Sequence, residues 1–187
     1  MELRGKMGKS LPIKDIKTIE AIKNEYRKEK KYKELLSFLL AINTGIKIND
    51  LLSLKVGDVL NKDILALNDQ ISNEIKTFIL TKEIKDLIPL VAKNRKKDEM
   101  LFAVNSKKSI SRIATYSHFN AVCKKLKIED KYSIASWRKT FAYHYYKQTG
   151  DLIKLMNIFH QCTVQQALKY IDEEQNLSLE LDRNFAL

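Results

Sequence analysis

Hydrophobic residues recur every three or four positions through most of this chain, a spacing that places them on one face of an α-helix. Four such sets stand out: Leu35, Phe38, Leu39 and Ile42; Ile84, Leu87, Ile88 and Val91; Phe119, Val122, Cys123 and Leu126; and Leu152, Leu155, Met156 and Phe159. These sets predict amphipathic helices that pack around a core. Cys123 is therefore expected to be a buried packing residue.

The helical spacing fails between about residues 56 and 80. Short apolar runs at residues 59–60, 64–67 and 78–80 are separated there by clusters of Asn, Asp and Ser. Runs of this length between turn-forming residues are typical of β-strands. We therefore predict a small antiparallel sheet in this region, with a third strand at residues 101–103 after the charged loop at residues 93–98.

Residues that begin and end helices flank several of these segments. Gly45 and Gly150 suit the left-handed turn that commonly follows the last helical residue. Asp151 can accept the first free N–H group of a helix, and Thr163 followed by Gln166 has the capping-box spacing, which predicts a helix start at Thr163. Pro89 lies inside a helical pattern and should kink or shorten that helix.

The composition fits one folded domain. A chain of 187 residues is expected to form one core without a disulfide or a metal ion. Lys and Arg outnumber Asp and Glu by 34 to 23, a formal net charge of +11. A polyanionic partner such as nucleic acid accounts for this charge, and so does a lysine-rich surface that only keeps the protein soluble.

Cysteine usage and hydropathy narrow the setting. Cys123 and Cys162 are far apart in ordinary contexts, so they suggest neither a disulfide framework nor a metal site. The first residues lack an apolar signal region, and no apolar stretch approaches the roughly eighteen residues that a membrane span needs. We therefore expect a soluble, cytoplasmic protein without a membrane contact.

One constellation of residues points to phosphodiester chemistry. Trp137 and Arg138 are followed by His160 and then, ten residues later, by Tyr170. The guanidinium of Arg138 can grip a phosphate with two N–H groups, His160 can hydrogen-bond it, and the Tyr170 hydroxyl can form a covalent link to phosphorus. Taken singly, Tyr170 could be a half-buried packing residue, His160 a helix-end histidine and Arg138 a surface arginine.

Two segments carry a resemblance to a known family, the tyrosine recombinases or phage integrases. Residues 43–59 resemble its first signature, in which Thr-Gly-Leu-Arg precedes a helix, and Lys47 stands where that catalytic arginine does. Near Arg138 the chain is similar to the His-x-x-Arg-(His/Lys)-Thr-Phe element, but Ala135 holds the histidine position. His160 and Tyr170 match the second histidine and the nucleophile, and Phe159 replaces the usual glycine.

The resemblance also implies a general-acid lysine on the hairpin between the second and third strands. Aligning residues 78–80 with the strand after that turn puts Gln70 or Ile71 in the lysine position. Lys76 is the nearest lysine that could take over the role. The register of a hairpin is set weakly by its sequence, so the position of Lys76 relative to the site is open at this point.

The resemblance implies a mainly helical α+β fold with a small antiparallel sheet, similar to the catalytic domain of tyrosine recombinases. Residues 1–187 are expected to form a single catalytic-type domain, because too few residues precede Leu35 to build the family's N-terminal DNA-clamping domain. The implied activity is site-specific recombination of double-stranded DNA through a 3′-phosphotyrosine link, without metal or other cofactor. A tetramer on two duplexes is implied, with residues after Ile171 packing on a neighbour.

Two further hypotheses stay open. The changes at Lys47 and Ala135 would suit a DNA-binding protein that has kept the scaffold and lost the chemistry. A basic structural protein unrelated to DNA would show no salt-dependent binding to duplexes. Several basic clusters, at residues 28–31, 95–97, 107–108 with Arg112, and 124–125, are solvated faces by default, although some would line a DNA channel on a recombinase scaffold.

Overall fold

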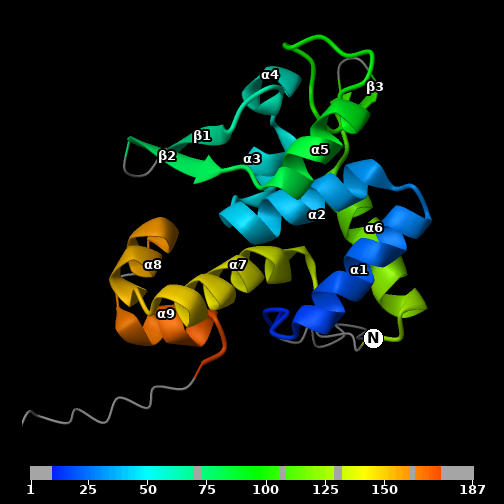
Figure 1. Ribbon diagram of the computed structural model, residues 1–187. Coiled ribbons are helices and arrows are strands. Elements are labelled where there is room, and N and C mark those ends of the chain that lie inside the picture. The colour runs from blue at the N-terminus through cyan, green and yellow to red at the C-terminus, as the bar shows by residue number, and fades with distance from the viewer. Residues whose placement is uncertain (1–9, 70–72, 106–107, 129–131, 161–162, 174–187) are drawn as a thin grey trace, which may run out of the picture.

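The computed structural model describes residues 10–69, 73–105, 108–128, 132–160 and 163–173 (Figure 1). In these residues helices predominate, and two short β-hairpins interrupt them. The elements in chain order are α1 (Ile16–Lys28), α2 (Tyr32–Thr44), α3 (Ile48–Leu52), α4 (Val56–Val59), β1 (Ile64–Asp69), β2 (Glu74–Ile79), α5 (Lys82–Val91), β3 (Ala103–Asn105), β4 (Lys108–Ser109), α6 (Arg112–Lys125), α7 (Ile134–Thr149), α8 (Leu152–Phe159) and α9 (Val164–Tyr170).

The helix boundaries follow the capping residues that the sequence predicts. Gly45 and Gly150 take left-handed conformations, with φ of +62° and +66°, directly after α2 and α7. The Asp151 carboxylate accepts the N–H of Lys154 at 2.8 Å, and α8 begins there. The Thr163 hydroxyl accepts the N–H of Gln166 at 3.1 Å and starts α9, the helix that ends with Tyr170. Helix α5 ends at Val91, two residues beyond Pro89.

The predicted sheet is present, but it is smaller than expected. Strands β1 and β2 pair antiparallel, with Leu67 opposite Lys76 and Asp69 opposite Glu74. The prediction of a third strand at residues 101–103 is wrong, because β3 pairs with β4 in a separate hairpin. The apolar run at residues 59–60 is not a strand either, since Val59 closes the short helix α4 and buries its side chain in the core.

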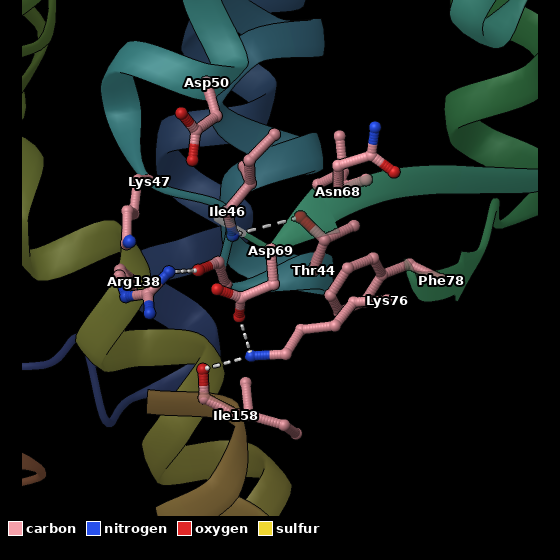
Figure 2. A pocket seen from close by; sticks show the side chains of 12 residues that line it. Thr44, Ile46, Lys47, Asp50, Asn68, Asp69, Lys76, Phe78, Arg138 and Ile158 are labelled. Carbon is pink, nitrogen blue, oxygen red and sulfur yellow. Dashed lines mark hydrogen bonds and ion pairs between the residues drawn. The ribbon is translucent and has the colours of Figure 1, made fainter. Parts of the chain in front are cut away.

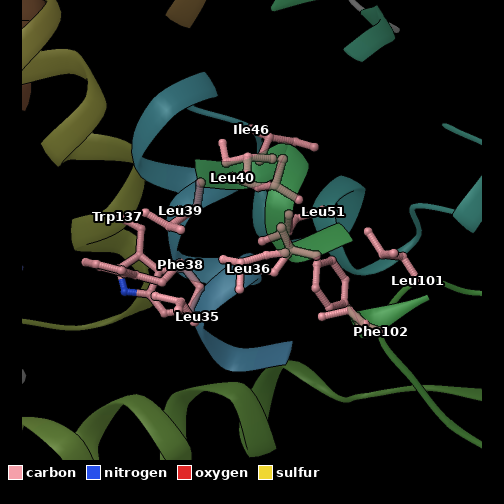
Figure 3. Close-up of a cluster of buried hydrophobic side chains, with 14 of the residues drawn as sticks. Leu35, Leu36, Phe38, Leu39, Leu40, Ile46, Leu51, Leu101, Phe102 and Trp137 are labelled. Carbon is pink, nitrogen blue, oxygen red and sulfur yellow. The ribbon is translucent and has the colours of Figure 1, made fainter. Parts of the chain in front are cut away.

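Most buried side chains form one large cluster around α2 (Figure 3). Helix α2 is buried on nearly all sides, with Leu35, Leu36 and Phe38 at 0% exposure. The ring of Trp137, from the start of α7, makes edge contacts with Phe38 at 5.6 Å and with Phe119 of α6 at 5.3 Å between centroids. Residues from α1 through α6 and from the first turn of α7 all belong to this large cluster. Cys123 is buried in it, as the sequence predicts.

A second, small cluster lies at the other end of α7. Its buried members are Ala142, Leu155, Phe159, Leu168 and Ile171. The prediction of a single core is therefore wrong. Helix α7 is 16 residues long, and the short helices α8 and α9 pack on it from Arg138 onward, away from α2 (Figure 1). Because α7 belongs to both clusters, it joins the two packing units.

The remaining histidines take packing roles. His144 makes a 3.0 Å hydrogen bond with the carbonyl of Ile13, and His118 contacts the Glu34 carboxylate at 3.0 Å. Among the described helices none is long and apolar enough to cross a membrane. Across the residues that the structure describes, no group of three His, Cys, Asp or Glu side chains is arranged to hold a metal ion.

Candidate active site

The first candidate residue, Lys47, follows a sharp turn at the end of α2. Gly45 reverses the chain there, and an added Cβ atom at this position would approach a ring carbon of Phe141 to 2.4 Å. Lys47 is the residue before α3, with an extended backbone, and its side chain is exposed. Its ammonium group makes no hydrogen bond or ion pair with another described residue, so its charge remains free for an anion.

Arg138 lies in α7 at the junction of the two clusters. Its guanidinium donates to the carbonyl oxygen of Gly45 (Figure 2). It also stacks on the Phe159 ring, 4.3 Å from the ring centroid. Burial lowers the pKa of Arg138, although the nearby Tyr170 and Asp50 act in the opposite direction. An arginine pKa starts so high that the group stays charged at any physiological pH. Arg138 is therefore a partly desolvated cation in a fixed orientation.

Tyr170 is the last residue of α9 and is half-buried. Its side chain is hydrogen-bonded to Arg138, and its ring packs 5.3 Å from the Phe159 ring. Burial raises the pKa of the Tyr170 phenol, whereas the charge and hydrogen bond of Arg138 lower it by less. The phenol is therefore neutral at physiological pH, and a cation lies where it would stabilise the phenolate.

His160, Lys76 and Asp69 meet on the other side of Arg138. Lys76 lies on β2 and Asp69 on β1, and both side chains point to the same face of the hairpin because the strands pair with Leu67 opposite Lys76. The Lys76 ammonium pairs with the Asp69 carboxylate and donates to the carbonyl of Ile158 at 3.2 Å (Figure 2). His160 Nε2 lies 2.7 Å from the same carboxylate oxygen and 3.3 Å from the Lys76 nitrogen.

These distances define the hydrogen-bond roles. Two acceptor atoms would repel each other at 2.7 Å. His160 Nε2 therefore carries a hydrogen and donates a hydrogen bond to the Asp69 carboxylate. Lys76 is a donor only, and its 3.3 Å approach to His160 is therefore a contact between two donors that share one acceptor. The Asp69 side chain is 9% exposed. It thus concentrates two N–H donors at one nearly buried point.

His160 is held by its backbone as well as by Asp69. It follows the last residue of α8 in a left-handed conformation, with φ of +55° and ψ of +42°. This conformation costs a residue other than glycine roughly 1–2 kcal/mol. The backbone N–H of His160 bonds to the carbonyl of Met156, and Phe159 beside it is buried in the small cluster. The packing of α8 therefore determines where the imidazole points.

Two hollows share Arg138 and Lys47 in their linings. The first, which we call the hairpin hollow, has a volume of about 80 Å³ and is lined by Lys76, Asp69 and Asp50 (Figure 2). The second, the tyrosine hollow, has a volume of about 200 Å³ and is lined by Tyr170 and Ala135. Lys47 and Arg138 line both hollows. The two cations therefore border both the hollow of Tyr170 and the hollow of Lys76.

The structure thus brings all five sequence-predicted residues to one region. Lys47, Arg138 and Tyr170 line the tyrosine hollow, and Lys76 lines the hairpin hollow with His160 in contact with it. The alternative lysine positions, 70 and 71, lie outside the described residues.

Sequence reasoning missed two contributors to this region, Asp69 and Phe159. Asp69 belongs to no motif, and only the pairing of β1 with β2 brings it next to Lys76. The family resemblance registers Phe159 as a departure from a glycine. In the structure the same residue supports both the Arg138 guanidinium and the Tyr170 ring. The position of Phe159 directly before the candidate residue His160 was the sequence signal that could have predicted its place in the site.

Comparison with known proteins identifies the family. The sequence model of the phage integrase family matches residues 9–176. The chain belongs to the phage integrase family. The probable integrase/recombinase YoeC of Bacillus subtilis (strain 168) is 29% identical to it over 166 residues, which are 88% of this chain and 91% of that protein.

Solved structures of recombinases share the fold of this integrase-family chain. XerA recombinase superposes with a TM-score of 0.71 at 17% identity, over 90% of this chain and 61% of that one. XerH bound to its difH substrate before cleavage gives 0.68 at 16% identity, over 89% of this chain and 52% of that one. The catalytic domain of bacteriophage HP1 integrase gives 0.54 at 14% identity, over 87% and 88% of the two chains.

These comparisons confirm the predicted fold class, a mainly helical α+β domain like the catalytic domains of tyrosine recombinases. The integrase-family chain spans about half to three fifths of the length of the XerH and XerA chains. At such low identity the structural likeness establishes the fold alone. The roles of individual residues therefore rest on their chemistry in this chain.

Proposed function

We propose that this protein is a site-specific DNA recombinase that cuts one DNA strand with Tyr170. The phenol oxygen attacks the scissile phosphorus, the bond from phosphorus to the 5′ oxygen breaks, and a 3′-phosphotyrosine link forms. The phenol loses its proton to solvent water as this link forms, and the departing 5′ oxygen gains a proton from Lys76. A phosphotyrosine ester keeps the energy of the phosphodiester, so the strand can be rejoined to a new partner without a nucleotide cofactor.

The observation that carries this proposal is the arrangement of the two hollows. In-line displacement at phosphorus needs the attacking and leaving oxygens on opposite sides, with cations around the remaining oxygens. Tyr170 lines one hollow and Lys76 the other, and Lys47 and Arg138 line both. A phosphate bound by these two cations would have the nucleophile on one side and a proton donor on the other.

Arg138 and Lys47 would stabilise the charge on the non-bridging oxygens. The Arg138 guanidinium is anchored by Gly45 and Phe159, so it needs little reorganisation when the phosphate arrives. Lys47 is free of described partners and would act as a point charge. Removing one such oriented donor costs about 3 kcal/mol, or about 100-fold in rate. His160 would add an N–H donor once the phosphate displaces its bond to Asp69.

Lys76 would protonate the leaving 5′ oxygen. Its ammonium carries three protons and no acceptor, and it is positioned by Asp69 and by the carbonyl of Ile158. An alkoxide is a poor leaving group, so proton transfer in the transition state contributes about 100-fold or more. Losing this proton donor should therefore slow cleavage of an ordinary phosphodiester strongly.

A selection for covalent complexes tests the proposal and finds the target sequence in the same experiment. Tagged protein is incubated with nicked duplexes whose central sequence is randomised, so that cleavage releases a short strand and traps the enzyme. DNA that survives a denaturing wash is sequenced. The wild-type protein should retain a defined sequence, and Tyr170→Phe, which keeps the ring and loses the hydroxyl, should retain none. Equal retention by the two proteins, or none by either, would contradict the proposal.

The selected duplex then tests the role of Lys76. In a duplex with sulfur in place of the bridging 5′ oxygen, the cleaved strand departs as a 5′ thiolate. This leaving group needs no proton, because a thiol ionises at roughly pH 8.5. Lys76→Ala should lose about 100-fold in cleavage of the oxygen substrate and little on the sulfur substrate. Equal losses on both substrates would show that Lys76 does not protonate the leaving group.

A second candidate function rests on Lys47 and Ala135. Lys47 binds a phosphate with less directional contact than an arginine, and Ala135 offers no hydrogen-bond donor in the tyrosine hollow. A DNA-binding protein without cleavage activity would suit these residues. In that case the wild-type protein binds duplex DNA with strong salt dependence and traps none, and the double variant Lys47→Arg, Ala135→His gains cleavage.

Assembly on DNA is part of the first proposal. Strand exchange needs one nucleophile for each of four strands, so four protomers would act on two duplexes. Light scattering of the protein mixed with its selected duplex should give the mass of four chains and two duplexes. A mass of one chain on one duplex at saturating protein would contradict this assembly.

A further inference from the structure

A third cationic residue, Arg112, lines the tyrosine hollow, and the proposed mechanism does not use it. Arg112 is the first residue of α6, and it lines this hollow together with Lys47, Arg138 and Tyr170. Sequence patterns place it among ordinary basic clusters, 26 residues before Arg138. Only the packing of α6 beside α3 and α7 brings it to the site.

The Arg112 side chain is free to bind an anion. It is exposed, and within the described part of the chain it forms no hydrogen bond and no ion pair. Arg138 in the same hollow is committed in part to the Gly45 carbonyl and to Tyr170. A guanidinium without such partners keeps its full set of donors for two oxygens of one phosphate.

The wall of the hollow next to Arg112 is mainly apolar, and Trp137, whose indole N–H is buried, also lines it. Ala135 lines the same hollow and ends in a methyl group, and its other neighbours there are apolar, namely Ala41, Ile48 and Ile134. The hollow has a volume of about 200 Å³. Arg112 is thus the exposed cation among the residues on this side of the hollow.

We infer that Arg112 is a phosphate-binding catalytic residue on the tyrosine side of the scissile phosphate, in the space that Ala135 leaves open. It donates to a non-bridging oxygen there and adds positive charge beside the phenol as it ionises. This inference rests on the proposed function, because it assigns Arg112 a place in the same reaction. It also explains how a hollow with alanine at position 135 can carry three cations around one phosphate.

The choice of side is a specific feature of the inference. Arg112 lines the tyrosine hollow and does not line the hairpin hollow, where Lys76 lies. Its loss should therefore impair attack and charge stabilisation and leave protonation of the 5′ oxygen unchanged. The oxygen and sulfur duplexes should therefore be affected alike by loss of Arg112, in contrast to loss of Lys76, and a residue that only held the fold together would also lower the melting temperature.

Single-turnover cleavage of the selected duplex tests the inference. Arg112→Ala should slow cleavage about 100-fold, and the loss should persist with the 5′-sulfur duplex, on which Lys76→Ala is nearly normal. Arg112→Lys should recover part of the rate, because a point charge replaces a planar fork. Lys124→Ala is the matched control, since Lys124 is an exposed cation near the other end of α6 and without a described partner. Arg112→Ala cleavage equal to that of Lys124→Ala would overturn the inference.

A double-mutant cycle with Ala135→His locates the effect. A histidine at position 135 places a donor in the same wall, so it should restore at least tenfold of the rate to Arg112→Ala and add little to the wild-type protein. Equal effects in both backgrounds would mean that Arg112 acts elsewhere. Circular dichroism melting of each variant excludes loss of folding as the cause, because Arg112 is exposed and its replacement should leave the melting temperature unchanged.

A binding measurement separates this inference from the proposed function. Affinity for a fluorescent duplex of any sequence is followed against salt, where each phosphate contact adds about 0.9 to the slope. Arg112→Ala should reduce the slope by about one, and Lys124→Ala should define the effect of a distant charge. If the wild-type protein forms no covalent complex but this slope still falls, the proposed function is wrong and the phosphate contact stands. An unchanged slope would overturn the inference whether or not the wild-type protein cleaves DNA.

Discussion

The large and small hydrophobic clusters differ in extent and in the site residues that they carry. The large cluster packs helices from both halves of the chain around α2, with three aromatic rings in mutual contact at its centre. The small cluster has five buried side chains, and partly buried tyrosines surround it. Lys47 and the β1–β2 hairpin with Lys76 are attached to the large cluster, whereas His160 and Tyr170 belong to helices of the small one.

The candidate site therefore lies where the two clusters meet. Arg138 donates from α7 to the Gly45 carbonyl, and Lys76 donates from the hairpin to the carbonyl of Ile158 in α8. His160 reaches Asp69 across the same boundary. The difference between the clusters suggests a division of labour, in which the large cluster holds Lys47 and Lys76 and the smaller unit holds the nucleophile Tyr170. The docking of the smaller unit can be weakened separately from the fold.

The largest effect is expected from matched leucine deletions in the two clusters. Leu36 and Leu155 are buried to 0% and 1% exposure, and replacing either by alanine should cost about 3 kcal/mol. The only tryptophan, Trp137, lies in the large cluster, so its fluorescence follows unfolding of that cluster. Leu36→Ala should lower the urea midpoint of this signal strongly. Leu155→Ala should lower it less, speed amide exchange in α8 and abolish covalent trapping.

The contrary result for this pair is simple to recognise. If both variants shift the Trp137 midpoint equally, the two clusters unfold as one unit and the division of labour is wrong. Proportional loss of trapping and of stability in both variants would lead to the same conclusion.

A somewhat smaller effect is expected at Gly45, where the clusters touch. Its φ of +62° costs an alanine roughly 1–2 kcal/mol, and the new Cβ atom would also press on the Phe141 ring. Phe141 packs against the small cluster, so the strain should displace α7 and with it Arg138. Gly45→Ala should therefore reduce cleavage about 100-fold, since an error of about 1 Å in position is enough. Gly150→Ala, also at positive φ but with no atom near the new Cβ, is the control for backbone strain alone.

Asp69→Asn should sharpen the comparison at the hairpin. The asparagine keeps the size of the side chain but removes the charge that holds Lys76 and His160 together. Cleavage of the oxygen duplex should fall about 10-fold through misplacement of Lys76, while the 5′-sulfur duplex loses less. A rate above that of the wild-type protein would instead identify Asp69 as an internal competitor of the phosphate.

The smallest effect is expected at Glu173, which ties the end of α9 to the rest of the chain. Its carboxylate pairs with Lys147 of α7 at 2.7 Å and with Lys14 at 3.1 Å. Burial raises the pKa of Glu173, but the two lysines outweigh it and hold the pKa below the usual value of 4.5. Glu173→Gln should cost less than about 1 kcal/mol and reduce trapping slightly.

The pH dependence of this tie has a definite sign. Because the folded pKa of Glu173 is lowered, its stabilising contribution is present above about pH 4.5 and is lost as the pH falls through the lowered pKa. Amide exchange at α9 should therefore become faster relative to that of α2 in this acid range, and the difference should shrink in Glu173→Gln. Equal acid responses of the two proteins would show that Glu173 does not hold α9.

Local patterns in the sequence were sufficient for the elements and for most of the site candidates. Helix spacing, the glycines at positions 45 and 150 and the Thr163 cap are short-range features, because caps and periodicity depend on neighbours within a few residues. The same patterns failed for the third strand, since the pairing of residue 103 with residue 109 satisfies its backbone locally and removes the need for β1 or β2. The length of the chain also predicted one core. Within the described residues, the short helices α8 and α9 instead contribute no side chain to the large cluster and form a second cluster with α7.

The sequence by itself determined which side chains this protein can use: Lys47, Arg138, His160 and Tyr170, named by type and order along the chain. Only the tertiary structure decided their surroundings. The pairing of Asp69 with Lys76, the stacking of Arg138 on Phe159 and the place of Arg112 in the same hollow as Ala135 all result from contacts between elements distant in the chain. No local pattern encodes such contacts, because they depend on how whole helices and hairpins dock and on which space that docking leaves open.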